Sequence, residues 1–239
     1  LDAGTGIRML GKALVKKTTP IHLLLTHNHW DHIQGFPFFA PIYMANREIS
    51  VTPGMTDENH PDAFLKQMSG SYFPVPKEAI GARIDIQTHS ENTWKIDSAT
   101  ISRLPMNHPG GGSCYTITSG NQKVAYVTDN ELYPPYKKNT DFLAFVDFVK
   151  DADVLIHDAQ YVVQDMPAKS GWGHSVAEEA IKLALAANVK TLALYSHDPE
   201  RTDDMIDEIV EHANHIIAIG GGSTNVVGAH EGLVIPINT

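Results

Sequence analysis

Cysteine is almost absent from this sequence, and so are long apolar runs. Its 239 residues include one cysteine, Cys114, which excludes an internal disulfide and favours a reducing, cytoplasmic environment. No apolar run approaches the roughly 20 residues that are needed to cross a bilayer, and the first residues do not have the pattern of a signal peptide. We therefore expect a cytoplasmic protein without a membrane-spanning segment.

Positive charge is also scarce. Lys and Arg together number 18 against 28 Asp and Glu, so the formal net charge is -10. Proteins bind nucleic acid largely by neutralising phosphates with Lys and Arg, so this balance makes a nucleic-acid partner unlikely. A small phosphate ester stays compatible with it, because metal ions can offset the charge of the ester.

The chain has no linker, no internal repeat and no low-complexity tract, and 42% of its residues are hydrophobic, which is ample for a core. We therefore expect one domain over residues 1–239. Periodicity and turn residues predict helices over residues 7–14, 33–39, 62–68, 141–150 and 202–212, and one more after a capping box of Ser175 and Glu178. Strands are predicted over residues 21–25, 42–45, 84–88, 93–96, 100–106, 115–118, 124–128, 154–156, 191–195, 216–219 and 232–235, with a hairpin turn at residues 119–122.

The strand predicted over residues 21–25 ends in a cluster of side chains that bind metals. The cluster holds His27, His29, Asp31 and His32 within six residues. Imidazole and carboxylate suit zinc and its first-row neighbours, and this spacing can serve two adjacent ions. A His-rich surface turn is the alternative, but a turn does not explain why the cluster directly closes an apolar strand.

Three later predicted strands end in a similar way, in His108, Asp129 and His197. Strands that deliver ligands to the same edge of a sheet are what a two-metal site requires. A lone histidine or aspartate after a strand is more often structural or exposed. The assignment of these three residues therefore depends on the first cluster.

The segment from Thr26 to His32, with the sequence THNHWDH, resembles the signature of the metallo-β-lactamase superfamily. The resemblance implies an α/β (α+β) fold, a four-layer αβ/βα sandwich with a metal site at one sheet edge. Because the chain opens at what looks like the end of a strand, we expect some N-terminal strands to be missing, as in a piece of a longer chain. In the family, a segment such as Asp2-Ala3-Gly4 packs beneath the ligand loop. A dinucleotide-binding turn is the alternative for this Gly-rich segment, but the third glycine has the wrong spacing.

The resemblance also implies two divalent ions, zinc in the first place, with manganese or iron also suited to these ligands. In the family pattern the first two histidines and the next one along the chain hold one ion, the Asp-His pair and the last histidine hold the other, and an aspartate bridges them. In that order the ligands are His27, His29 and His108, then Asp31, His32 and His197, with Asp129 as the bridge.

Two further residues resemble the phosphodiesterase branch of the family, which includes transfer-RNA 3′ endonucleases (tRNase Z) and phosphonate-pathway cyclic phosphodiesterases. There a histidine such as His174 donates a proton to the leaving oxygen and is oriented by a carboxylate such as Asp158. An alkoxide leaves poorly, and a histidine titrates near neutral pH, so this role is chemically sound. The catalytic set implied is His174, Asp158 and Asp31. The alternative is that His174 only caps or packs at a helix start.

Other branches fit less well. Cys114 lies too close to His108 to replace a ligand of the second ion, as a cysteine does in the best-known β-lactamases, and the family's electron-transfer branch carries Glu where this chain has His29. A tRNase Z carries a long basic arm before the bridging aspartate, whereas 20 residues separate His108 from Asp129 here. We therefore expect hydrolysis of a small phosphodiester, a cyclic nucleotide or a cyclic sugar phosphate. The nucleophile expected from the family is a hydroxide bridging the two ions.

Two other functions stay open: a tRNase Z-like RNA endonuclease, and a non-catalytic, metal-binding regulatory module of a larger protein. Loss of a ligand would be the mark of such a module, and every ligand is in place. A homodimer, or a further domain in a longer parent chain, also stays open. Four aromatic residues could either stack on a base or sugar or belong to the core: Tyr72, Phe73, Tyr161 and Trp172.

Overall fold

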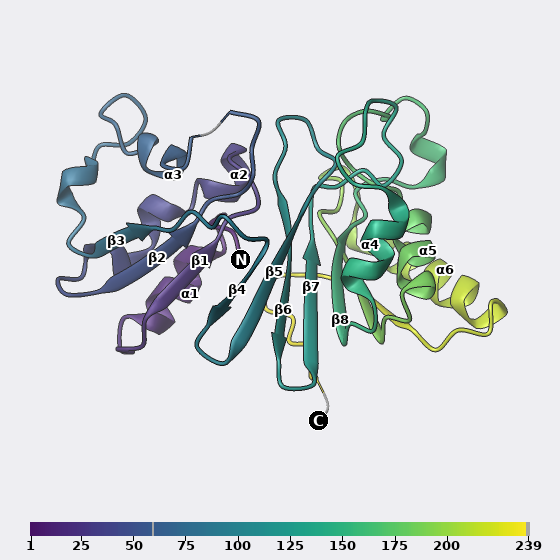
Figure 1. The fold of residues 1–239 in the computed structure, drawn as a ribbon. Helices are drawn as coiled ribbons and strands as arrows, with labels where there is room; N and C mark the ends of the chain where they lie inside the picture. Colours follow the sequence, from purple (N-terminus) through teal and green to yellow (C-terminus); the bar gives the residue numbers. More distant parts are fainter. Residues whose placement is uncertain (59, 238–239) are drawn as a thin grey trace. The chain divides into compact units, whose positions relative to one another are not determined.

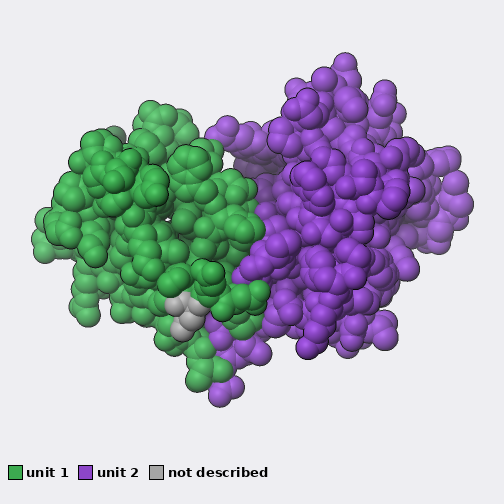
Figure 2. Space-filling model, turned by 90° about the horizontal axis from the view of Figure 1, so that it is seen from above, with its two compact units in different colours: residues 1–90 green, residues 91–239 purple. Residues whose placement is uncertain are grey.

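The computed structural model describes residues 1–58 and 60–237 of the chain. These residues form two compact units, one up to residue 90 and the other from residue 91 onward (Figure 2). Each unit combines a β-sheet with helices, which confirms the α/β class expected from the sequence. The expectation of a single domain over residues 1–239 stays a prediction. Within the described part of the chain, no helix has both the length and the apolar character that a membrane crossing demands.

The first unit is built on a parallel sheet with the strand order β1-β2-β3 (Figure 1). Its strands are β1 (Ile21–Leu24), β2 (Glu48–Thr52) and β3 (Arg83–Ile86). Its helices are α1 (Ile7–Leu14), α2 (Trp30–Ile33) and α3 (Ala63–Lys66), with 3₁₀ turns η1 (Phe36–Phe38), η2 (Ala40–Tyr43) and η3 (Lys77–Ala79). Apolar side chains from the strands and the helical segments form one core, which includes Leu23, Phe36, Phe39, Ile49 and Phe64.

Helix α1 lies close to η1 and η2, and a glycine makes this close packing possible. A Cβ atom added at Gly11 would lie 2.8 Å from Cδ2 of Phe39, nearer than real Cβ atoms approach. Phe39 is fully buried, so its ring has little room to move aside. The packing of α1 on these turns therefore requires glycine at position 11.

The second unit is built on a sheet with the strand order β10-β9-β8-β7-β6-β5-β4. Strands β4 (Thr93–Ile96), β5 (Ala99–Pro105), β6 (Ser113–Ser119) and β7 (Gln122–Val127) pair antiparallel to their neighbours. The predicted hairpin is confirmed, because Ser119 of β6 pairs with Gln122 of β7. From β7 onward the pairing is parallel, through β8 (Val154–Asp158), β9 (Thr191–Tyr195) and β10 (Asn225–Gly228).

Each parallel connection in the second unit contains a helix, as parallel strands require. These helices are α4 (Phe142–Val149), α5 (Ala177–Ala186) and α6 (Asp203–Ile219), and a 3₁₀ turn η4 (Val163–Asp165) precedes α5. All three helices pack into one core with alternate residues of the strands, among them Val127, Leu155 and Leu194.

Several expected elements differ from the structure. Residues 42 and 43 belong to the η2 turn, residues 44 and 45 form no strand, and the strand of this region is β2, which begins at Glu48. Residues 216–219 belong to the end of α6, and residues 232–235 form no strand, whereas the short edge strand β10 lies before them. The capping box is also wrong: helix α5 begins after Val176, and the Ser175 hydroxyl donates to the Asn130 carbonyl at 2.6 Å.

The topology of the second unit explains why its polar residues gather at one edge. Strand β5 runs antiparallel to β6, which runs antiparallel to β7, so β5 and β7 point the same way. Strands β8 and β9 are parallel to β7. The carboxyl ends of these four strands therefore meet at one edge, which is where parallel sheets form their sites.

Candidate metal centre and acid group

In the first unit, four candidate ligands follow β1 as two close pairs. His27 Nε2 lies 2.9 Å from His29 Nδ1, and His32 Nε2 lies 3.3 Å from Asp31 Oδ2. The rings of His27 and His32 are themselves adjacent, with centroids 4.2 Å apart. His27 and His32 are buried, whereas His29 and Asp31 are exposed. Two pairs of electron donors side by side suit two neighbouring cations, as the spacing in the sequence predicts.

Asp2 supports this loop from beneath. Its carboxylate accepts hydrogen bonds from the Thr26 backbone N–H at 2.7 Å and from the Thr26 hydroxyl at 3.0 Å. It also lies 2.9 Å from Nδ1 of His32. A histidine that donates its Nδ1 proton to a carboxylate presents Nε2 to a metal with a fixed ring orientation. The structure therefore confirms the expected packing of the segment from Asp2 to Gly4 under the ligand loop.

Backbone contacts hold the same segment in place. The Ala3 N–H donates to the His32 carbonyl at 2.7 Å, and the Gly35 N–H donates to the Ala3 carbonyl at 2.8 Å. The chain segments approach so closely that a Cβ atom at Gly35 would lie 1.9 Å from the Gly4 carbonyl oxygen. Any residue other than glycine at position 35 would therefore displace the segment that carries Asp2.

In the second unit, three of the expected residues come together after β5, β7 and β8. One nitrogen of His108, one carboxylate oxygen of Asp129 and one nitrogen of His174 all lie within 4.8 Å of one another. His108 and Asp129 are buried. Asp129 has a φ of 47°, a left-handed conformation that is uncommon for aspartate and is often found at functional sites. It lies in a bend two residues after the end of β7, which places its carboxylate at the sheet edge.

His174 is bound to the buried carboxylate of Asp158. Its Nδ1–H donates to Asp158 Oδ2 at 2.6 Å, and Asp158 has no solvent exposure. Backbone N–H groups of Asn130, Gln160 and Ser175 donate to the same carboxylate. Burial raises the pKa of Asp158 to about 6, against the lowering effect of the His174 hydrogen bond. Because Nδ1 is occupied, Nε2 is the nitrogen of His174 that can exchange a proton with a ligand.

Glu131 is a functional candidate that we did not predict. Its two carboxylate oxygens accept the backbone N–H groups of Gly171 at 2.9 Å and Gly173 at 3.0 Å. The loop held in this way carries His174, and its Gly173 carbonyl accepts a hydrogen bond from Nδ1 of His108 at 2.9 Å. Glu131 therefore positions both histidines through one loop. The sequence offers no signal for this role, because a buried glutamate and an exposed one look alike in it.

Gly173 is the point where this loop touches His108. It has a φ of 90°, and a Cβ atom there would lie 2.2 Å from Nδ1 of His108. Both the backbone conformation and the space therefore require glycine. The carbonyl of Gly173 can then hold the His108 ring with Nε2 directed away from it.

His197 follows β9 as predicted, but it is not in the cluster of His108, Asp129 and His174. Its Nε2–H donates to the Ala229 carbonyl at 3.2 Å, and burial lowers its pKa below the usual value. The assignment of His197 as a ligand stays a prediction. If it is correct, the ligand atom is Nδ1, or the ring turns away from Ala229.

The remaining histidines divide into two kinds. Five that we expected at the surface or in packing are exposed: His22, His60, His212, His215 and His230, and His89 is half-buried. His157 is different, because it lies on β8 with no solvent exposure and its Nδ1–H donates to the Asp158 carbonyl at 2.6 Å. Burial lowers its pKa to about 4, so it is neutral at physiological pH.

The donor sets of both units fit divalent metal ions. The Nδ1–H of His32 donates to Asp2, and the Nδ1–H of His108 donates to the Gly173 carbonyl. In each neutral ring the lone pair that could bind a metal is therefore on Nε2. Neutral imidazoles and carboxylates together are the ligands of zinc, manganese and iron sites.

Comparison with known proteins places these features in a family. Residues 1–197 match the model of the β-lactamase superfamily domain. A ribonuclease Z of Kineococcus radiotolerans is 34% identical over an alignment of 282 residues that covers 99% of this chain and 85% of that protein. A ribonuclease Z of Thermoplasma volcanium is 38% identical over 154 residues, but the match covers 59% of this chain and 47% of that protein. The chain thus spans less than half the length of that relative.

Two solved structures have a similar fold. Human tRNase Z, short form, has a TM-score of 0.65 and 18% identity, over 100% of this chain and 87% of that one. A diphosphatase of the PhnP family has a TM-score of 0.63 and 16% identity, over 97% of this chain and 77% of that one.

Proposed function

Because the chain belongs to the metallo-β-lactamase superfamily of metal-dependent hydrolases, we propose that it hydrolyses a small phosphodiester with two divalent ions. The observation that carries this proposal is the hydrogen-bonded pair of His174 and Asp158 beside the candidate ligands His108 and Asp129. A histidine held by a carboxylate in this way can act as a metal ligand or as a proton donor, and we propose the second role for His174. A site that breaks a phosphodiester needs a proton donor for the leaving oxygen.

We assign the metal ligands by the family order. One ion takes His27, His29 and His108, the other takes Asp31, His32 and His197, and Asp129 bridges them. Each of the two units is supported separately, by the paired donors in the first and by the cluster of His108 and Asp129 in the second. Divalent ions in such a site supply Lewis acidity for the phosphoryl oxygens and activate water. Zinc is the ion that we favour, with manganese and iron as alternatives.

His174 moves the proton in this proposal. Asp158 holds its Nδ1–H, which fixes the ring and leaves Nε2 to protonate the departing oxygen of the ester. Glu131 and Gly173 keep the loop in place, so that the donor does not have to be ordered during the reaction. Asp31 also belongs to the predicted catalytic set, but the only role that we propose for it is that of a metal ligand.

A small substrate is supported by charge and by chain length. The net charge of -10 disfavours a long polyanion, and the residues between His108 and Asp129 contain only β6, β7 and short connections. The alignment to the Kineococcus protein is longer than this chain of 239 residues, so that relative carries insertions that this chain lacks. We therefore favour a cyclic nucleotide or a cyclic sugar phosphate over RNA.

RNA cleavage is the second candidate, because both relatives named above are ribonucleases Z. A non-catalytic, metal-binding module is a third candidate, and the presence of every expected ligand disfavours it. A single panel separates the three. Metal-loaded protein would be given 2′,3′- and 3′,5′-cyclic nucleotides, a ribose cyclic phosphate and a precursor transfer RNA, with metals counted in the same sample.

Hydrolysis of a cyclic ester with about two ions per chain is the expected result. Cleavage of the precursor RNA alone would favour the second candidate. Bound metal without any hydrolysis would overturn the proposal and favour the third. The Asp129→Ala variant serves as the control, because it should lose metal and activity together.

A further inference from the structure

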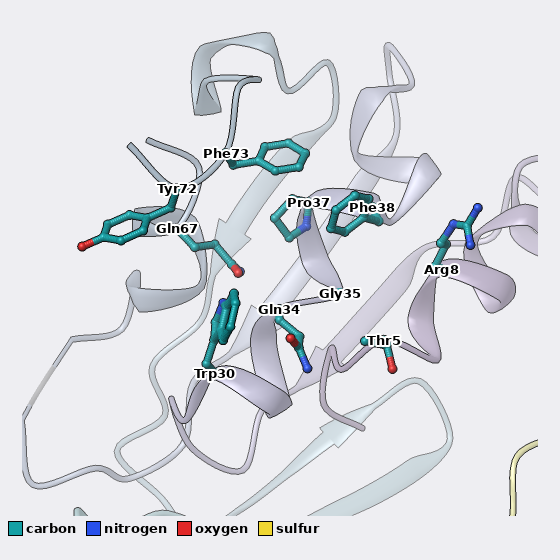
Figure 3. Close-up of a pocket in the computed structure, with 10 residues that line it drawn as sticks. All are labelled: Thr5, Arg8, Trp30, Gln34, Gly35, Pro37, Phe38, Gln67, Tyr72 and Phe73. Carbon is teal, nitrogen blue, oxygen red and sulfur yellow. The ribbon is translucent and has the colours of Figure 1, made fainter. Parts of the chain in front are cut away.

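The first unit contains a cavity of about 580 Å³ that the proposed chemistry does not use (Figure 3). Its size is within the range of pockets that bind small organic molecules. Aromatic side chains form much of the wall, and they are Trp30, Phe38, Tyr72 and Phe73. All of the lining residues belong to the same unit, from α1 to the segment after α3.

These aromatic side chains are unusually exposed. Tyr72 is 83% exposed, Trp30 is 69% exposed and Phe38 is 54% exposed. The rings of Phe38 and Phe73 pack edge to face, with centroids 5.2 Å apart, so this part of the wall is ordered by its own contacts. Contiguous exposed apolar surface commonly marks a binding site. For Tyr72, the structure thus favours a ligand-facing role over a place in the core, whereas Phe73 is half-buried and also packs against the core of the first unit.

Two of the polar side chains that line the cavity are amides, those of Gln34 and Gln67. The Gln67 Nε2 donates to the carbonyls of Ile33 at 2.7 Å and Phe64 at 2.8 Å, so the side chain is fixed. Its carbonyl oxygen points into the cavity, toward Trp30 (Figure 3). Gln34 adds a second amide beside Trp30 (Figure 3). Aromatic faces together with a fixed amide oxygen match a flat heteroaromatic ring that has a hydrogen-bond donor along its edge.

The charge of the lining suits an anionic ligand. Arg8 is the one charged residue among those that line the cavity, and no carboxylate lines it within the described part of the chain. This contrasts with the net charge of -10 of the whole protein. A nucleotide would therefore meet a local positive charge in this cavity and not a repulsive surface.

The cavity begins at the ligand loop itself. Trp30 stands between His29 and Asp31, and Gln34 and Gly35 follow directly after α2. Trp30 is thus the chain neighbour of two candidate metal ligands. We propose that this cavity binds the nucleobase of a nucleotide phosphodiester whose phosphate is hydrolysed at the adjacent ligand loop. The inference rests on the proposed function for the phosphate and on the cavity alone for the base.

The first test measures binding without activity. Adenosine 5′-monophosphate would be titrated into metal-free protein by calorimetry, with wild type compared with Tyr72→Ser. Because Tyr72 is exposed, this substitution should not disturb folding. Loss of one stacking contact should weaken binding by roughly tenfold. The matched control is Leu143→Ser, which removes another highly exposed apolar side chain (73% exposed) from α4 in the other unit and should leave the affinity unchanged.

The second test compares two esters on metal-loaded protein. Tyr72→Ser should raise KM for a cyclic nucleotide by roughly tenfold with little change in kcat. The same variant should leave KM and kcat unchanged for a ribose cyclic phosphate, which has no aromatic ring. Equal effects on both esters, or no effect on either, would overturn the base-binding role.

Two further outcomes separate this inference from the proposed function. Specific binding of the nucleotide without hydrolysis of any ester would support the cavity and overturn the phosphodiesterase. Hydrolysis of both esters without measurable nucleotide binding would support the phosphodiesterase and overturn the base-binding role of the cavity. Sedimentation of wild type and Tyr72→Ser covers the remaining case: a dimer that this substitution dissociates, without an effect on the nucleotide, would overturn the inference.

Discussion

His174 and Asp158 are joined by a hydrogen bond of 2.6 Å, and the carboxylate that accepts it is wholly enclosed by protein. Three backbone N–H groups converge on the same carboxylate, so Asp158 cannot turn away from the ring. The ring of His174 is thus fixed through its Nδ1–H. This arrangement distinguishes a proton donor from a histidine that only fills space at the start of a helix.

Removal of His174 should separate catalysis from metal binding. We expect His174→Ala to lower kcat by about 10²- to 10⁴-fold, the range for loss of a general acid, with the metal content retained. Elemental analysis and turnover of a cyclic nucleotide would be measured on the same sample. Because a nitrogen of His174 lies within 4.8 Å of His108 and Asp129, a metal ligand is the competing role. Loss of about one ion per chain from this variant would favour that role.

Glu131 should act on the reaction through the loop that it holds. Glutamine offers one acceptor where two N–H groups need one each, so Glu131→Gln should leave a buried group unpaired. The expected loss in free energy of unfolding is about 1–3 kcal/mol. We also expect a lower kcat at temperatures where the variant is fully folded, because His174 and His108 share this loop. Glu78→Gln, at an exposed glutamate, is the matched control. A stability loss with unchanged kcat would reduce Glu131 to a structural role.

Asp2 should affect metal affinity without being a ligand. Asp2→Asn weakens the acceptor for His32 Nδ1–H, so we expect the affinity for one ion to fall by about 10- to 100-fold. Competition against a coloured chelator would measure this change. Asp57→Asn, at an exposed aspartate of the same unit, should bind metal as wild type does. Unchanged affinity for both ions in Asp2→Asn would contradict the orienting role.

His157 should contribute to acid unfolding. Burial lowers its pKa from 6.5 to about 4 in the folded protein, whereas the unfolded chain takes up the proton at the usual pH. The free energy of unfolding should therefore fall as the pH drops from about 6.5 to about 4, by up to about 3 kcal/mol. His157→Asn keeps a donor for the Asp158 carbonyl but cannot titrate, so its pH profile should lack this part of the decline.

The carboxyl group of Asp158 changes the pH dependence of the free energy of unfolding in the opposite direction. Burial raises the pKa of Asp158 to about 6, so its contribution to stability is greatest at low pH and is lost as the pH rises through about 6. Both proteins in the comparison keep Asp158, so the difference between the two pH profiles isolates His157. Denaturant unfolding of chelator-treated samples would provide both profiles. Parallel profiles would contradict the assignment to His157.

The sequence predicts the strand ends of this protein better than its irregular segments. The helix over residues 7–14 and the strands over residues 93–96 and 191–195 agree with the structure residue for residue. Residues 216–219 were predicted as a strand because four apolar residues in a row fit a buried strand or a buried helix equally well. The sequence of β2 alternates polar and apolar residues, which is a strand signal that the prediction overlooked. Strand β10, over residues 225–228, has only four residues and is too short to give a clear signal.

The candidate site follows the same rule. His27, His108 and Asp129 could be predicted because their place after apolar strands is visible in the order of residues. Glu131 could not, because its role depends on burial and on two glycines some 40 residues further along the chain. The capping box failed for a related reason: Ser175 has the right spacing to Glu178, but its hydroxyl binds the Asn130 carbonyl instead.

The strand order of the second unit has a consequence for how it folds. Strands β4 to β7 pair only with sequence neighbours, whereas β8, β9 and β10 each require a helical crossover before they can pair. Local pairings have a lower entropic cost of loop closure and form faster. We therefore expect the antiparallel ribbon to gain protection first in pulse-labelled hydrogen exchange, and the parallel strands later. The nascent ribbon would already carry His108 and Asp129, while Asp158 and His174 would arrive only with the crossovers.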